Sequence, residues 1–300
     1  VGQNLSAAGV QVIDAENCIV MPGFVDSHSH LWSAFLRGSI RGDDKVRGYF
    51  PTTNRASSLC SPDDAHVSAR FALMEGLLSG VTCVNNYSHN TSSVQHAEAE
   101  IQGSVDVGTR TRFSYGPPGR NGAFDRNGVE QIVKRWRSRD PLITLGVNLL
   151  LPSPKVLKSG GDDPTFVDEV KFSKAHDLPI SLHYGNTAHG LVEFMDKRGL
   201  LGPEILLIHP QGFTPQEREA LVARNVQFSI SPVIEICYSK VRNGYTQFDE
   251  LEKLGASLSI STDASGASAN YDFFMVMRAM LWSHKERDDV DRQSLTPKRI

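Results

Sequence analysis

Four histidines and one aspartate fall where the chain could assemble a metal site. They end or directly follow the first, fifth, sixth and eighth predicted strands: His28, His30, His183, His209 and Asp263. In a parallel barrel, the carboxyl ends of the strands form the face on which active sites are built. Three neutral imidazoles and a carboxylate suit a borderline metal such as zinc and leave one position for water. These residues therefore predict a metal site with an open position for water.

His28 and His30 are spaced so that both can contact one ion. Residues two apart on an extended segment project their side chains to the same side. Alone, such a pair is weak evidence, because two polar residues at a strand end are the ordinary alternative. Its co-location with His183, His209 and Asp263 favours the metal site. Zinc suits this ligand set best, and iron or manganese would also be accommodated.

The elements that must position these residues are short apolar or β-branched runs that alternate with amphipathic helical stretches. Such runs, bounded by Gly, Pro, Asn or Ser, are typical of buried parallel strands. The alternation predicts a parallel α/β fold, although a doubly wound open sheet also fits the pattern. No G-x-G-x-x-G follows the first strand, which argues against a dinucleotide site. The predicted strands span residues 23–28, 81–85, 111–115, 143–148, 179–183, 205–209, 226–229 and 257–262.

Helix starts are readable between these strands. Ser61 offers an N-cap before Pro62, and apolar residues then follow at helical spacing until Gly80. Thr214 and Glu217 have the spacing of a capping box, which predicts a second helix start.

Composition limits the class of protein. A net charge of −3 gives no electrostatic reason to expect a nucleic acid or an anionic membrane as partner. No run approaches the roughly 20 apolar residues of a membrane helix, and the start of the chain lacks a secretory signal. The four cysteines are scattered, which argues against disulfides and favours a cytoplasmic location. We expect a small-molecule substrate, and a homo-oligomer is compatible with the sequence.

Residues 21–30, MPGFVDSHSH, resemble the PGFxDxHxH signature that opens the barrel of the amidohydrolase superfamily. The segments around His183, His209 and Asp263 are similar, in order and spacing, to later motifs of that family. Residues 85–90 and 272–278 resemble the branch that contains cytosine deaminase-like enzymes and triazine chlorohydrolases.

The resemblance implies a distorted (β/α)₈ TIM barrel over residues 23–300. It also implies that residues 1–22 form part of a small β domain, whose C-terminal part would be truncated here. The same resemblance implies one metal held by His28, His30, His183 and Asp263. Asp263 would also take the proton of the attacking water, and His209 would orient that water or polarise the substrate.

Three further residues are candidates for contacts with substrate: His89, Trp32 and Glu235. Each has an ordinary alternative, namely a loop histidine, a packing aromatic and a solvated loop acid.

Two positions depart from the family pattern. The fourth strand ends at Asn148, where two-metal members carry a lysine, so we expect one metal. Asn186 stands where deaminases of this branch carry a glutamate, and an amide cannot donate a proton as a carboxylic acid does. We therefore expect hydrolysis of a non-peptide carbon–nitrogen bond in a small cyclic or amide-bearing molecule. The alternatives are a deaminase or dehalogenating relative acting on a heterocycle, and a truncated barrel without catalysis.

Overall fold

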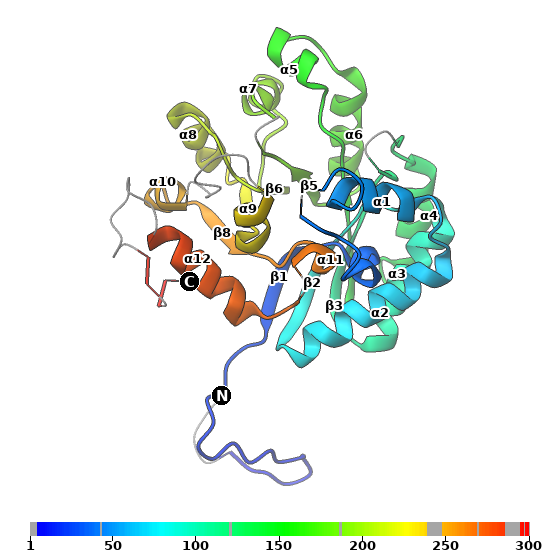
Figure 1. Cartoon of the computed structure of the whole chain (residues 1–300), viewed down its shortest axis with the longest axis vertical. Coiled ribbons are helices and arrows are strands. Elements are labelled where there is room, and N and C mark those ends of the chain that lie inside the picture. The colour runs from blue at the N-terminus through cyan, green and yellow to red at the C-terminus, as the bar shows by residue number, and fades with distance from the viewer. Residues whose placement is uncertain are drawn as a thin grey trace.

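The computed structural model describes residues 5–42, 44–119, 122–185, 188–238, 248–268, 270–285, 295–296 and 298–299. In this part of the chain eight parallel strands follow one another in sequence order around a barrel, with helices outside them (Figure 1). An isolated parallel bridge between Ser29 and Asp263 joins the first strand to the segment after the last. The predicted (β/α)₈ barrel is therefore confirmed, and the open doubly wound sheet is not what forms.

The strands lie within a few residues of their predicted bounds. Their order and spacing explain why the five candidate residues meet, since each follows or ends a strand at the same rim. The strands are β1 (Phe24–Ser29), β2 (Val81–Ser88), β3 (Arg110–Tyr115), β4 (Ile143–Asn148), β5 (Ile180–His183), β6 (Ile205–Ile208), β7 (Gln227–Ile230) and β8 (Ser257–Ile260).

The helices surround the strands and cover their outer faces (Figure 1). A 3-10 helix, η1 (Leu31–Leu36), directly follows the first histidine pair. The α-helices are α1 (Tyr49–Ser57), α2 (Pro62–Leu78), α3 (Val94–Val107), α4 (Arg126–Trp136), α5 (Pro154–Ser159), α6 (Pro164–Ala175), α7 (Leu191–Asp196), α8 (Pro215–Ala223), α9 (Pro232–Tyr238), α10 (Phe248–Lys253), α11 (Ser265–Ser268) and α12 (Phe273–Lys285).

Both predicted helix starts are confirmed. Ser61 forms a full capping box with Asp64 at the start of α2, and Thr214 forms one with Glu217 at the start of α8. In each box the cap side chain accepts a backbone N–H while the acid accepts the N–H of the cap residue. Such reciprocal bonds satisfy donors that a helix start otherwise leaves free, and thereby fix where it begins.

The interior of the barrel is polar, whereas the layer between strands and helices is apolar. Ser27 and Ser229 share a hydrogen bond of 2.8 Å across the barrel, and Ser114 donates to Asn85 at 2.9 Å. Alternate residues of the same strands, such as Phe113, face outward into the main apolar cluster. The fold is therefore held mainly by its outer layer, which leaves the interior available for polar chemistry.

Residues 5–23 carry no strand in the structure and lead away from the barrel (Figure 1). Their hydrogen bonds within the backbone are local, as between Val10 N–H and the Ala7 carbonyl. Several of their apolar side chains are exposed, including Ile13 and Ile19. A β-strand is stable only when it pairs with neighbouring strands, and none of the described residues pairs with this segment. The small β domain over residues 1–22 stays a prediction.

Two further expectations can be compared with the structure. All four cysteines are free, so the absence of disulfides expected from their scatter holds. Among the described residues, no helix is both long and apolar enough to cross a membrane.

Gly116 is expected to be indispensable for packing, whereas Gly76 is not. A Cβ at position 116 would lie 1.4 Å from Oδ1 of Asn148, and overpacking of this kind costs about 1–3 kcal/mol. At Gly76, inside α2, the nearest atom would be 3.6 Å away, and Gly→Ala in a helix stabilises by about 0.5–1 kcal/mol. Urea unfolding should therefore move in opposite directions for Gly116→Ala and Gly76→Ala. Equal stability of the two variants would contradict this account.

Candidate metal centre

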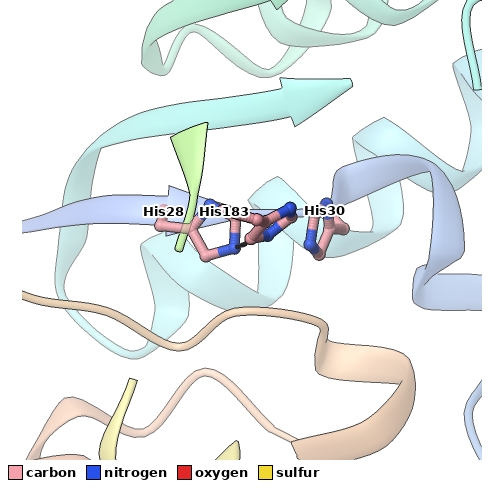
Figure 2. Close-up of side chains that lie close together, drawn as sticks. All are labelled: His28, His30 and His183. Carbon is pink, nitrogen blue, oxygen red and sulfur yellow. Dashed lines mark hydrogen bonds between the residues drawn. The ribbon is translucent and has the colours of Figure 1, made fainter. Parts of the chain in front are cut away.

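The five candidate residues meet at the carboxyl rim of the barrel. β1 supplies His28 and leads into His30, β5 ends at His183, and the residues after β6 and β8 supply the others. Figure 2 shows His28, His30 and His183 gathered at this rim. Two groups of ligand atoms each lie within 4.8 Å of one another: those of His28, His30 and His183, and those of His28, His209 and Asp263.

The distances describe a compact cluster of donor atoms. Nε2 of His28 lies 3.2 Å from Nε2 of His183. Oδ1 of Asp263 lies 3.5 Å from Nε2 of His28 and 3.3 Å from Nε2 of His30. One ion placed among these atoms would be contacted by residues from three different strands.

A carbonyl group fixes the tautomer of His30. Nδ1 of His30 lies 2.9 Å from the carbonyl oxygen of Tyr87, which can only accept, so Nδ1 carries the proton. In the neutral ring, Nε2 then presents its lone pair toward the Asp263 carboxylate. Two acceptors that face each other are stabilised by a cation between them, and such carbonyl-oriented imidazoles are common among metal ligands.

The other two imidazoles are neutral at physiological pH. Burial lowers the pKa of His28 to about 4, although Asp263 opposes this shift. Burial and the neighbouring His28 and His30 hold the pKa of His183 well below its ordinary value. Neutral imidazole is the form that binds metals. The donor set of three imidazoles and one carboxylate therefore fits a divalent metal ion.

Asp263 is ionised and His209 is protonated. Burial acts to raise the pKa of Asp263, but the attraction of His28, which is charged only at pH values near or below its own pKa of about 4, and a hydrogen bond from His209 outweigh it and hold that pKa well below its usual range. Burial acts to lower the pKa of His209, yet contacts with Asp263 (3.2 Å) and Glu235 (3.1 Å) raise it to about 10. His209 thus donates from both ring nitrogens to two carboxylates.

Backbone strain coincides with this site. His209 has a φ of 59° and Asp263 a φ of 62°, in the left-handed region that non-glycine residues seldom adopt. Backbone hydrogen bonds hold both: His209 N–H donates to the Ser229 carbonyl at 3.0 Å and Asp263 N–H to the His28 carbonyl at 3.0 Å. Strained residues that neighbouring strands hold in place are a common feature of functional sites.

Asp26 supports the cluster from beneath, although the sequence analysis did not single it out. It is fully buried and accepts hydrogen bonds from Thr262 N–H at 3.1 Å, from Thr262 Oγ1 at 2.5 Å and from His28 N–H at 3.4 Å. Burial raises its pKa to about 7, with the bonds from Thr262 opposing. Asp26 therefore ties β1 to the segment that carries Asp263. In the sequence, the feature that could have pointed to Asp26 is its place in the motif between Gly23 and His28.

The predicted substrate residues lie in three different settings. The His89 ring is 4.3 Å from that of His30 and 5.4 Å from that of Trp32, so it borders the cluster. Trp32 is buried, with 1% of its surface exposed. Glu235 is a buried residue of α9 that contacts His209 and accepts Ser231 N–H at 2.9 Å, so it is not a solvated loop acid. Direct contact of these residues with substrate stays a prediction.

The two departures from the family pattern have different outcomes. Asn148 ends β4, as predicted, and its amide donates to the carbonyl oxygens of Ser88 and Ser114 at 3.1 and 2.8 Å. It is therefore committed to the backbone and is not placed as a metal ligand. Asn186 lies outside the described residues.

The chain is similar to a known protein family and to individual enzymes. The amidohydrolase family matches residues 19–300. A 5'-deoxyadenosine deaminase of Methanothrix thermoacetophila is 24% identical, over 99% of this chain and 70% of its own length. Among similar curated deaminases, the chain spans between 62% and 70% of each relative's length.

Solved structures share the fold. A triazine hydrolase of Arthrobacter aurescens superimposes with a TM-score of 0.79 at 17% identity, covering 100% of this chain and 72% of its own. An adenosine deaminase of Xanthomonas campestris with bound zinc gives 0.71 at 20% identity, covering 88% of this chain and 61% of its own. The match over residues 19–300 and the histidine cluster within it agree: the chain belongs to the amidohydrolase family.

Proposed function

We propose that this protein is a hydrolase that holds one divalent metal and cleaves a non-peptide carbon–nitrogen bond of a small heterocyclic molecule. The observation that carries the proposal is the convergence of three imidazoles on one ionised carboxylate at the rim of the barrel. The metal ligands are His28, His30, His183 and Asp263. Zinc is the metal we assign, because this nitrogen-rich set suits it and a related structure contains it.

The chain's own residues divide the chemistry. A divalent metal at this site supplies Lewis acidity, which makes water nucleophilic at neutral pH. Asp263 is ionised because its pKa is held low, so it would be able to accept a proton from such a water. His209 donates from Nε2 and lies beside Asp263, so it stabilises negative charge that develops on the substrate. Glu235 orients His209 through Nδ1.

A ring amine is the second candidate for the bond that breaks. Its support is the name of the relative from Methanothrix thermoacetophila, a 5'-deoxyadenosine deaminase. A deaminase must protonate the ring nitrogen, and Asn186 cannot supply that proton. A ring-amine substrate therefore requires another donor, either His89 or a water molecule. His89 borders the cluster, but burial holds its pKa well below the ordinary value, so it donates as a neutral ring.

A substrate panel tests the proposal. Zinc-loaded protein is incubated with 5'-deoxyadenosine, guanine, cyclic amides and chlorinated triazines, and released ammonia, amine or chloride is measured. We expect turnover of at least one class that stops when the metal is removed by a chelator and returns when zinc is added. A folded, metal-loaded chain that turns over none of them would leave the non-catalytic barrel as the better explanation.

Glu235→Gln is expected to lower kcat by about 10- to 100-fold, the loss typical of a misplaced hydrogen-bonding partner. Metal content should not change, because Glu235 is not among the ligands. Glu235 helps to raise the pKa of His209, so its removal lowers that pKa. The alkaline limb of the pH–rate profile should then move to lower pH. Glu193→Gln, a change in an exposed pair with Lys197, serves as control and should retain both values. An unmoved alkaline limb would argue against this role of Glu235.

A further inference from the structure

A cavity lies at the opposite end of the barrel from the metal centre. Its volume is about 510 Å³, and we call it the amino-end cavity because residues at the beginnings of most of the strands line it. Exposed residues such as Arg110 and Pro203 form part of its lining, so it opens to solvent. Its size lies within the range of about 300–1,000 Å³ that is usual for small-molecule sites.

Arg112 projects into this cavity from inside the barrel. Side chains alternate along a strand, and on β3 the neighbouring Phe113 packs in the outer apolar layer while Ser114 donates to Asn85 in the interior. Arg112 shares the inward face with Ser114. On the adjacent strand stands Gly146, where a Cβ would lie 3.3 Å from Cδ of Arg112. The glycine thus leaves room for the arginine side chain.

The guanidinium of Arg112 has no anionic partner among the described residues. The two carboxylates that line the cavity are engaged elsewhere: Asp26 with Thr262, and Glu204 with Lys174. The Cys83 thiol also lines the cavity, but burial raises its pKa, so it is neutral. Burial lowers the pKa of Arg112 itself, which reflects the cost of an unpaired charge. An anion in the cavity would remove that cost.

The remaining lining suits a ligand that is partly apolar. Leu142, Pro179 and Pro203 contribute hydrocarbon surface, whereas Thr144 and Ser259 offer hydroxyl groups. We propose that the amino-end cavity binds a small organic anion whose carboxylate or phosphate pairs with Arg112. Arginine presents two parallel N–H groups that match either oxyanion. This site is separate from the metal centre, which the opposite ends of the same strands carry.

Calorimetric titration of the metal-loaded protein tests this proposal with three probes. Benzoate carries a carboxylate on an apolar body, inorganic phosphate carries charge alone, and benzamide is the neutral counterpart of benzoate. We expect one benzoate or phosphate per chain and at least about 10-fold weaker binding of benzamide, because a hydrogen bond to a charged group is lost. Tighter benzoate would identify a carboxylate ligand, and tighter phosphate a phosphate ligand. Equal binding of benzoate and benzamide, or no binding of either anion, would overturn the proposal.

Matched variants place the anion. Arg112→Gln should weaken anion binding by about 10- to 100-fold, and Arg112→Lys, which keeps the charge, should weaken it less. Arg110→Gln removes an exposed arginine at the same opening and should change the affinity by less than about threefold, as surface charges do. Circular dichroism checks folding, and if Arg112→Gln does not fold, benzoate binding to Arg112→Lys, compared with that to Arg110→Gln, places the anion. Anion binding that Arg112→Gln leaves unchanged would assign the anion to the metal centre instead.

Discussion

His183→Ala is expected to purify with less than about a tenth of the metal that the unchanged protein holds. His183 is the proposed ligand from β5, and its Nε2 lies 3.2 Å from that of His28. Without it, the remaining nitrogens come from β1 alone, and the ion loses contact with the far side of the rim. Removal of a group that merely supports a ligand costs about 10- to 100-fold in metal affinity, so removal of a ligand should cost at least that much. Elemental analysis after zinc loading measures the change.

The control for this experiment is His66→Ala. His66 lies in α2, away from the rim, where it contacts Asp106 at 2.8 Å. This variant should keep about one zinc per chain. A ratio near one, rather than two, is expected for the unchanged protein because Asn148 replaces the lysine that bridges two ions and is bonded to backbone carbonyls. Full metal retention by His183→Ala would refute the proposed ligand set.

Asp263→Asn is expected to lower kcat by about 10³-fold or more, even when zinc is supplied in excess. In the proposed mechanism Asp263 is both the carboxylate ligand and the base, and proton transfer by a positioned side chain contributes about 10²- to 10⁴-fold. An amide keeps the size of the side chain but accepts protons poorly. The pKa of Asp263 is held well below its usual range and that of His28 is about 4, so the unchanged protein should stay active down to about pH 4, where His28 is protonated before Asp263. Single-turnover kinetics on zinc-loaded protein separate this loss from weaker substrate binding.

Asp106→Asn provides the comparison for that variant. Asp106 lies on the surface in the pair with His66, so its amide should leave kcat unchanged. The metal content of Asp263→Asn must be measured in the same samples, because the variant removes a ligand as well as a base. A zinc-saturated Asp263→Asn protein that keeps more than a tenth of the activity would assign the base to another residue.

The strands were predictable from the sequence because buried parallel strands are short, apolar and bounded by residues that break them. β4 matches its predicted range, residues 143–148, and the others differ by at most three residues at either end. The differences fall at strand ends, where hydrogen bonding to the neighbouring strand decides the limit. β2, for instance, continues to Ser88 because its last residues pair with β3 up to Tyr115.

The orientation of α2 could not be read from its pattern. Helical spacing of Phe71, Met74 and other apolar residues indicated the helix correctly, yet these side chains are about half-exposed. The face against the barrel consists of small residues such as Ala69 and Ala72. Small side chains on one face of a helix allow its backbone to lie close to the neighbouring elements. Which face does so depends on α3 and η1, which the helix contacts extensively.

The clustering of the candidate ligands was predictable from the sequence, but the contacts that support them were not. Residue type and position at strand ends were sufficient for His28 and Asp263, since parallel strands bring these ends together. Asp26 contacts Thr262, which lies 236 positions away, and Glu235 contacts His209, which follows β6. Neither contact follows from local spacing. The left-handed backbone of His209 and Asp263 is likewise set by neighbouring strands rather than by their own sequence.

The bridge between Ser29 and Asp263 has a consequence for biosynthesis. These two residues are 234 positions apart. Ser29 lies between the proposed ligands His28 and His30, and Asp263 is itself a proposed ligand. The nascent chain therefore carries a histidine pair early but cannot complete the metal site until β8 has left the ribosome. An ion bound across that bridge would connect the two ends of the sheet after synthesis. Removal of the metal should accordingly loosen the barrel first at this junction, where strand pairing among the described residues is reduced to the Ser29–Asp263 bridge.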